Sequence, residues 1–155
     1  MKKIKLSFSI FLLCFFACSK SDVFFEFRST ENGSWDRSKP AIFEINISDT
    51  IKSYSLDLIV RNNDDYAFQN IWLFIDRKDP KGIFTSDSLT IELADAYGKW
   101  HGKGLSIYSL TIPYQSDVLF SDSGCYTYTI RQGMRKNPLR GISDIGLRLS
   151  KNSAQ

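Results

Sequence analysis

The feature that most constrains the fold is an alternation of apolar and polar residues in short segments. Within Ala41–Ser48, the apolar residues Phe43, Ile45 and Ile47 alternate with polar ones. A period of two places successive side chains on opposite faces, which is the pattern of a β-strand with one face buried. An amphipathic helix would repeat its apolar residues every three to four positions instead. The pattern therefore predicts strands.

Seven further segments read as short strands. They are Asp22–Phe27, Ser53–Arg61, Gln69–Asp76, Ser88–Leu93, Leu105–Ile112, Cys125–Arg131 and Gly141–Ser150. Clusters of turn-forming residues separate them, and of these Asn62–Asp65 is predicted to be a solvated hairpin and Asp79–Gly82 another turn. About eight strands without a convincing helix predict an all-β fold. We expect a single antiparallel β-sandwich, jelly-roll or immunoglobulin-like, over residues 24–150, with 151–155 as a tail.

One predicted strand differs from the others because it is apolar throughout. Residues 71–75 read Ile-Trp-Leu-Phe-Ile. A strand that is apolar on both faces is typical of the centre of a sheet. We therefore expect this strand to be central and Trp72 to be buried in the core.

The first 17 residues have the layout of a secretory signal peptide. Lys2, Lys3 and Lys5 precede an uncharged run, Leu6–Ala17, of 12 residues. Twelve helical residues span about 18 Å, too short for a hydrocarbon core of about 30 Å. The small residue at the end of the run is followed at once by Cys18, as in a bacterial lipobox. The sequence thus predicts export and lipidation of Cys18, with 18–23 forming the lipidated cysteine and a short tether.

The remaining cysteine and the charge balance narrow the range of structures and functions to expect. After loss of Cys14 and acylation of Cys18, only Cys125 is left, so no disulfide framework is expected, and Cys125 is predicted to be a small buried residue on a strand. Removing the three lysines of the signal from the 20 Lys and Arg leaves 17, equal to the 17 Asp and Glu. A neutral domain gives no reason to expect nucleic-acid binding.

Catalytic and metal-binding patterns are lacking in the sequence. His101 is the one histidine, and no nucleophile elbow of the G-x-S-x-G type occurs. The Gly-rich segment Gly98–Gly104 lacks the spacing of a phosphate-binding loop, and Asn62–Asp65 lacks that of an EF-hand calcium loop. We expect no enzyme, no metal and no cofactor.

Two groups of residues are candidates for binding. Arg135 and Arg140, together with Arg131 and Lys136, make the segment before the last strand basic. This segment, Gly133–Gly141, is predicted to serve partners and not folding, because binding residues are commonly placed on loops. Trp35 and Trp100 are candidates to stack on sugars if their rings are exposed.

Several segments resemble the gliding-motility lipoprotein GldH family of Bacteroidetes. The resemblance rests on Arg61-Asn62 with Asp65-Tyr66, Asn70–Ile75, Pro80 and Gly82, Asp87–Leu89, Leu93–Asp95, Gly98–Trp100 with Gly102, Gly133–Arg135, Leu139 and Gly141–Leu147. It implies an accessory cell-envelope lipoprotein that faces the periplasm, in the inner or outer membrane, and acts with other gliding-motility or secretion-apparatus proteins. The family supplies no catalytic residues.

The resemblance also suggests modification sites and a choice between two functions. Asp49-Thr50-Ile51 and Asp87-Ser88-Leu89 resemble the motif that such bacteria O-glycosylate, which makes Thr50 and Ser88 candidate acceptors. The leading interpretation is a non-enzymatic interaction protein tethered by Cys18. The alternative is a glycan-binding β-sandwich that uses Trp100 or Trp35 as its platform.

Overall fold

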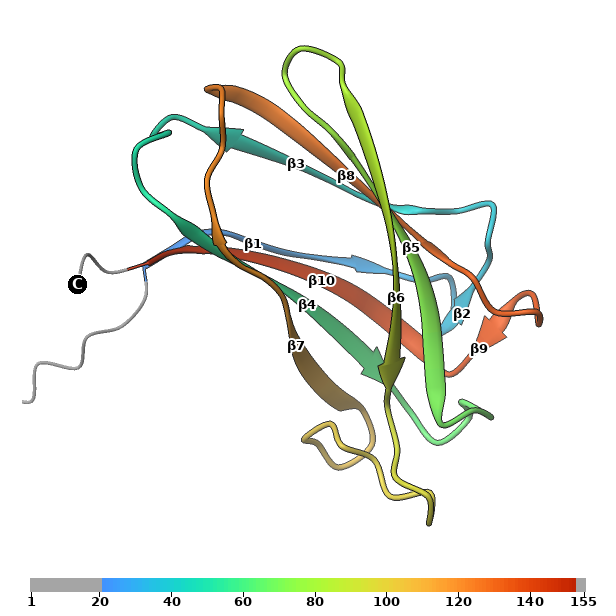
Figure 1. The fold of residues 1–155 in the computed structure, drawn as a ribbon. Coiled ribbons are helices and arrows are strands. Elements are labelled where there is room, and N and C mark those ends of the chain that lie inside the picture. Colours follow the sequence, from blue (N-terminus) through green and yellow to red (C-terminus); the bar gives the residue numbers. More distant parts are fainter. Residues whose placement is uncertain (1–20, 153–155) are drawn as a thin grey trace, which may run out of the picture.

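The computed structural model describes residues 21–152, and its regular elements are all strands (Figure 1). They are β1 (Ser21–Ser29), β2 (Ser34–Trp35), β3 (Ala41–Ile47), β4 (Tyr54–Asn62), β5 (Asn70–Lys78), β6 (Phe84–Glu92), β7 (Tyr108–Val118), β8 (Gly124–Gln132), β9 (Leu139–Arg140) and β10 (Ile142–Lys151). Eight of them correspond to the predicted strands. The two-residue strands β2 and β9 were not predicted, because so short a segment carries no alternation.

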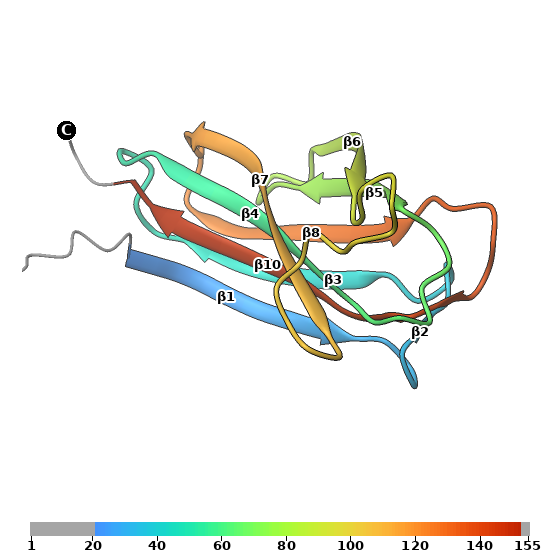
Figure 2. The same ribbon diagram turned by 90° about the horizontal axis from the view of Figure 1, so that it is seen from below.

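The strands form two four-stranded antiparallel sheets that pack face to face. The strand order is β1-β10-β4-β7 in one sheet and β3-β8-β5-β6 in the other, while β2 and β9 pair with each other. Figures 1 and 2 show the two sheets as facing layers. The prediction of an all-β antiparallel sandwich is confirmed.

The core lies between the two layers and follows the alternation read from the sequence. In β3, Phe43, Ile45 and Ile47 are buried, and the residues between them are exposed. From the opposite sheet, Leu56 and Leu58 of β4 are fully buried. Burial of apolar side chains from both inner faces is what stabilises a sandwich of this kind.

The connections between strands differ in part from the prediction. Asp79–Gly82 is the turn of the β5–β6 hairpin, as expected. Asn62–Asp65, however, is not a hairpin, because β4 and β5 belong to different sheets and the chain crosses between them here. Two boundaries also moved: β6 begins at Phe84 and β7 at Tyr108.

Two burial predictions were wrong, and both for the same reason. β5 is an interior strand between β8 and β6, as predicted, but Trp72 is 44% exposed and Phe74 is 42% exposed. Cys125 is exposed too. A sandwich buries only one face of each strand. In β8 that face carries Tyr126 and Tyr128, so Cys125 points outward.

The predicted signal peptide and Cys18 lie outside the described residues. Within residues 21–152, the structure contains no helix long and apolar enough to cross a membrane. The first strand begins at Ser21, which pairs with Lys151 of β10.

Candidate functional site

The outward face of β5 carries two large aromatic side chains that rest against the end of β8. A Cβ atom added to Gly133 would lie 2.8 Å from Phe74 Cε2 and 2.9 Å from Trp72 Cδ1. The absence of a side chain at Gly133 is therefore what allows both rings to lie against this backbone. The Gly133 N–H also donates to the Trp72 carbonyl at 2.6 Å. β8 and β5 thus fix the position of the two rings.

Met134 forms the neighbouring wall. Its sulfur accepts a hydrogen bond from the Trp72 N–H at 3.3 Å, and its own N–H donates to Gln132 Oε1 at 2.9 Å. Gln132 is fully buried, and its amide nitrogen donates to Asn137 Oδ1 at 3.0 Å. A buried amide that makes these bonds holds the following turn in one conformation. The turn after β8 is therefore part of the folded scaffold.

These walls enclose an open cleft of about 410 Å³. It is lined by Phe68, Asn70, Trp72, Gly133, Met134, Arg135 and Lys136. We call it the Trp72 cleft. Its interior is formed mainly by aromatic, thioether and glycine surface, while the exposed cationic side chains of Arg135 and Lys136 line it as well. Such a site can accept an apolar side chain that has an acidic group beside it.

The basic residues predicted as one group separate in the structure. Arg135 lines the Trp72 cleft, whereas Arg140 lies on β9 and lines a different hollow of about 390 Å³. Arg131 forms an ion pair with Asp76 at 2.6 Å on the outer face of its sheet. The Ser86 hydroxyl and Arg131 together hold the pKa of the Asp76 carboxyl below its ordinary value. Only Arg135 of the three arginines therefore lies at the cleft.

The expectation that Gly133–Gly141 has no role in folding was wrong, for its second half as well as for the turn after β8. Leu139 is 1% exposed and belongs to the core. Gly141 is buried at φ +83°, and a Cβ atom there would lie 2.1 Å from the Tyr66 nitrogen. Residues 139–141 thus belong to the scaffold. The exposed residues of the segment are Arg135, Lys136, Asn137, Pro138 and Arg140, and of these Arg135 and Lys136 line the Trp72 cleft.

Trp100 and Trp35 are engaged within the fold. The Trp100 indole N–H donates to Asp64 Oδ1 at 2.9 Å, and its ring lies 6.5 Å from that of Tyr66 and 5.9 Å from that of Tyr108, between centroids. Trp100 therefore attaches the Gly-rich loop to the β4–β5 connection. Trp35 is 3% exposed. Trp72 is the tryptophan whose ring is most open to solvent.

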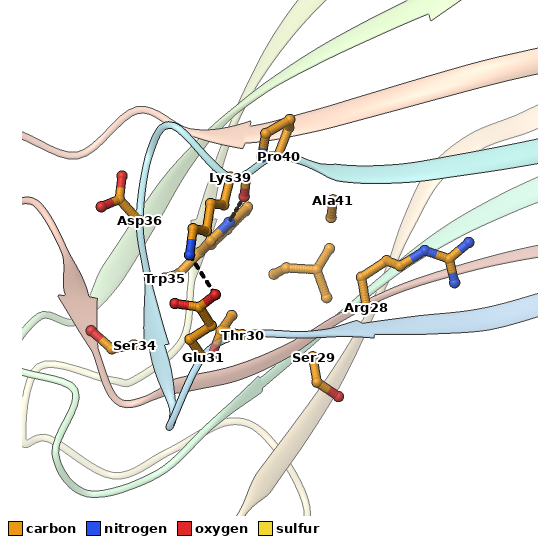
Figure 3. Close-up of a pocket in the computed structure, with 11 residues that line it drawn as sticks. Arg28, Ser29, Thr30, Glu31, Ser34, Trp35, Asp36, Lys39, Pro40 and Ala41 are labelled. Carbon is orange, nitrogen blue, oxygen red and sulfur yellow. Dashed lines mark hydrogen bonds and ion pairs between the residues drawn. The ribbon is translucent and has the colours of Figure 1, made fainter.

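A smaller cavity of about 210 Å³ lies along the seam between β1 and β3 (Figure 3). The Lys39 ammonium and the Glu31 carboxylate form an ion pair across it, and the Trp35 indole N–H donates to the Lys39 carbonyl at 2.9 Å. At its other end, Arg28 Nε donates to the Ile42 carbonyl at 2.8 Å. Because these polar groups already bond to one another across the seam, we interpret this cavity as structural.

The remaining candidate residues lie apart from the Trp72 cleft. Ser88 is exposed on the edge strand β6, and Thr50 lies half-buried in the β3–β4 connection. Both stay predictions as O-glycosylation sites, as does lipidation of Cys18, which lies outside the described residues. Within residues 21–152, no group of three or more His, Cys, Asp or Glu side chains is placed to hold a metal ion.

Sequence reasoning missed the residues that define the cleft. Trp72 was assigned to the core and Phe68 was not considered, while Met134 fell within the predicted partner segment Gly133–Gly141 but was not singled out. One signal was present: Trp72 and Phe74 lie on one face of β5 and Leu73 and Ile75 on the other, so burying all of them would require cover on both faces of the sheet. The sequence alone did not reveal that Gly133 and Met134 supply only partial cover on the outer face.

By fold, the described chain is an antiparallel β-sandwich domain with an apolar cleft on one outer face, a class that serves many functions. Residues 22–149 match the family model described as GldH lipoprotein. A protein of Christiangramia forsetii named gliding motility lipoprotein GldH homolog is 33% identical over 94% of this chain and 97% of its own length. The gliding motility lipoprotein GldH of Flavobacterium johnsoniae is 30% identical over 86% of this chain and 87% of its own. No solved structure matches.

The chain belongs to the GldH lipoprotein family. Membership implies a lipid-anchored protein of the cell envelope, in a family that is not known for any enzyme activity. The resemblance noted from the sequence is confirmed.

Proposed function

We propose that this chain is a non-enzymatic accessory lipoprotein of the gliding-motility type. It is anchored through lipid on Cys18, faces the periplasm and docks on other envelope proteins of the gliding or secretion apparatus through the Trp72 cleft. The names of the two relatives support the motility assignment. The cleft supports the docking role.

The observation that carries this proposal is the exposure of large apolar side chains beside two cations. Trp72 is 44% exposed, and Arg135 and Lys136 line the same cleft. Tryptophan and arginine are the residue types that most often dominate the binding energy of protein interfaces. The partner segment expected here presents an apolar side chain with a carboxylate next to it, which satisfies both the ring surface and the guanidinium.

The test is cross-linking in the native envelope with the full-length lipoprotein. A photoreactive amino acid replaces Lys136 in the cleft or, as the control, Thr111 on the outer face of the other sheet; both positions are exposed. We expect one or a few envelope proteins to be captured from position 136 and not from position 111. Equal capture from both positions would contradict a docking role for the cleft.

A pair of substitutions tests the contribution of the ring. Trp72→Ala removes the cleft wall, and Phe25→Ala removes an aromatic ring of similar exposure, 51%, from β1 of the other sheet. Trp72→Ala should abolish co-purification of the captured protein, while Phe25→Ala should retain it. Binding to insoluble peptidoglycan that Trp100→Ala abolishes without lowering the melting temperature would support glycan binding instead.

A further inference from the structure

One end of the sandwich gathers the start of the described chain and three connections. Along one sheet, Ser21 pairs with Lys151, Lys151 with Tyr54 and Tyr54 with Val118. Along the other, Ile47 pairs with Gly124 and Lys78 with Phe84. The connections 48–53, 79–83 and 119–123 therefore extend from the same end as Ser21. We call it the anchor end; it lies to the left and top of Figure 1.

Each of the three connections exposes a large apolar side chain at this end. Ile51 is 91% exposed, Leu119 is 65% exposed and Ile83 is 60% exposed. Phe84, the first residue of β6, adds a ring that is 68% exposed. Single exposed apolar residues are ordinary on protein surfaces. At the opposite end, the exposed large apolar residues Tyr97, Leu105 and Ile107 all belong to one connection, whereas at the anchor end each of the three connections carries one. This distribution favours a surface that is covered.

Side-chain hydrogen bonds fix two of these connections. Asp49 Oδ1 accepts the N–H of Ile51 at 3.1 Å, and the Tyr54 hydroxyl donates to the Asp49 carbonyl at 2.7 Å. Asp79 Oδ1 accepts the N–H of Ile83 at 2.8 Å. Because the apolar residues are held in formed turns, little conformational entropy is lost when they are covered.

At the anchor end, Lys52 and Lys78 are matched in number by Asp79 and Asp117, and two further lysines are paired with carboxylates. Lys81 forms an ion pair with Asp122 at 2.8 Å, and Lys151 forms one with Asp49 at 3.4 Å. Such pairs leave little net attraction for an anionic surface. An occupant of this end is therefore recognised by its apolar character more than by its charge.

The position of the anchor identifies the occupant. Cys18 precedes Ser21 by three residues, which span at most about 11 Å even when fully extended. If Cys18 carries lipid, as the proposed function holds, the bilayer surface lies within that distance of the start of β1. The three connections extend from the same end, so they lie on the side of the domain that the anchor holds towards the bilayer.

We propose that the anchor end docks on the bilayer surface, with Ile51, Ile83 and Leu119 inserted at the boundary between headgroups and acyl chains. This inference rests on the anchor at Cys18 but not on the docking role of the Trp72 cleft. Apolar side chains bury favourably at this boundary in peripheral membrane proteins. The lipid anchor makes the contact intramolecular, so modest affinity is enough.

The test uses the full acylated lipoprotein in vesicles of phosphatidylethanolamine with a minor share of phosphatidylglycerol. In a Cys125→Ser background, Ile51→Cys or Leu105→Cys receives an environment-sensitive fluorophore. Leu105 is the matched control, because it is 97% exposed and lies in the β6–β7 connection at the opposite end. Spin-labelled lipids should quench the fluorophore at position 51 and leave position 105 unquenched.

The outcomes are separable. Flotation of the protein with the vesicles reports the anchor. If the protein floats but the fluorophore at position 51 is quenched no more than that at position 105, the membrane contact is overturned and the anchor is not. Protein that does not float overturns the anchor at Cys18 and this inference with it, but leaves the cleft open to its own cross-linking test.

A second variant tests the apolar nature of the contact. The double substitution Ile51→Ser and Leu119→Ser should reduce quenching of a fluorophore at position 83, because each lost aliphatic side chain weakens burial by about tenfold. Leu105→Ser should leave it unchanged. Omitting phosphatidylglycerol should also have little effect, whereas quenching that disappears without it would overturn the apolar mode of docking.

Discussion

The different burial of Trp35 and Trp72 leads to a quantitative prediction. Both residues lie on strands, but Trp35 is 3% exposed and Trp72 is 44% exposed. A tryptophan presents about 200 Å² of surface, and removal of apolar surface from water stabilises by about 25 cal/mol per Å². Near-complete burial of Trp35 thus corresponds to about 5 kcal/mol. Partial burial of Trp72 corresponds to about 3 kcal/mol, and both values are upper bounds because the unfolded chain is itself partly collapsed.

Two local features widen the difference. Trp35→Ala leaves a cavity in the core and an unpaired Lys39 carbonyl, which accepts the indole N–H at 2.9 Å. The space that Trp72→Ala leaves is open to solvent, so water fills it and no buried cavity remains. We therefore expect Trp35→Ala to lower the free energy of unfolding at least twice as much as Trp72→Ala.

The assay is urea unfolding of the soluble form that begins at Ser19, followed by far-ultraviolet circular dichroism. The midpoints should shift in the stated order while the slope with urea stays constant. If Trp35→Ala does not fold, Trp35→Phe keeps most of the volume and supplies the comparison. A loss for Trp72→Ala equal to or larger than that for Trp35→Ala would refute the assignment of the outer face of β5.

Three further predictions follow from the structure. Gly141→Ala should lower the free energy of unfolding by about 2–4 kcal/mol, because this position combines a positive φ with a Cβ contact of 2.1 Å to the Tyr66 nitrogen. Gly98→Ala is the control, since φ is +82° there but a Cβ atom meets open space, and thermal unfolding should show a smaller loss. Cys125, being exposed, should react with a thiol reagent in the native protein without denaturant, and protection until unfolding would contradict its placement. Burial raises the pKa of Tyr128 to about 12 and that of Tyr66 further. The folded state therefore keeps protons that unfolded tyrosines release above about pH 10. The stabilisation that these two tyrosines contribute should be fully present below that pH and be lost as the pH rises towards 12. Tyrosinate absorbance, measured together with the free energy of unfolding at each pH, checks this.

Strand positions could be predicted from the sequence because the alternation reports a local property. Phe43, Ile45 and Ile47 are buried as the period of two requires. The pairing of strands could not be predicted, because it depends on contacts between residues far apart in the chain. Asn62–Asp65 shows this limit: its composition favours a turn equally well in a hairpin and in a crossover between sheets.

The apolar run of β5 shows why the candidate site escaped prediction. In sequence, Trp72 and Phe74 cannot be told from Leu73 and Ile75, because hydrophobicity alone does not say which face of a sheet is covered. Covering the outer face would need a helix or a second layer of chain. Among the described residues, the Gly133 backbone and Met134 lie against the rings there, and Phe68, Arg135 and Lys136 line the cleft beside them without closing it. What remains open is the Trp72 cleft.

The direction of β5 relates the two proposed surfaces. Trp72 lies near the start of this strand and Lys78 at its end, where β5 meets Phe84 at the anchor end. Six residues of antiparallel strand separate them by about 20 Å. A bilayer in contact with the anchor end therefore leaves the cleft on the part of the sandwich that faces away from lipid. Because about 20 Å separates the two surfaces, an occupant of one does not have to displace an occupant of the other. A partner that binds the cleft must accordingly present its own binding segment about 20 Å above the headgroups.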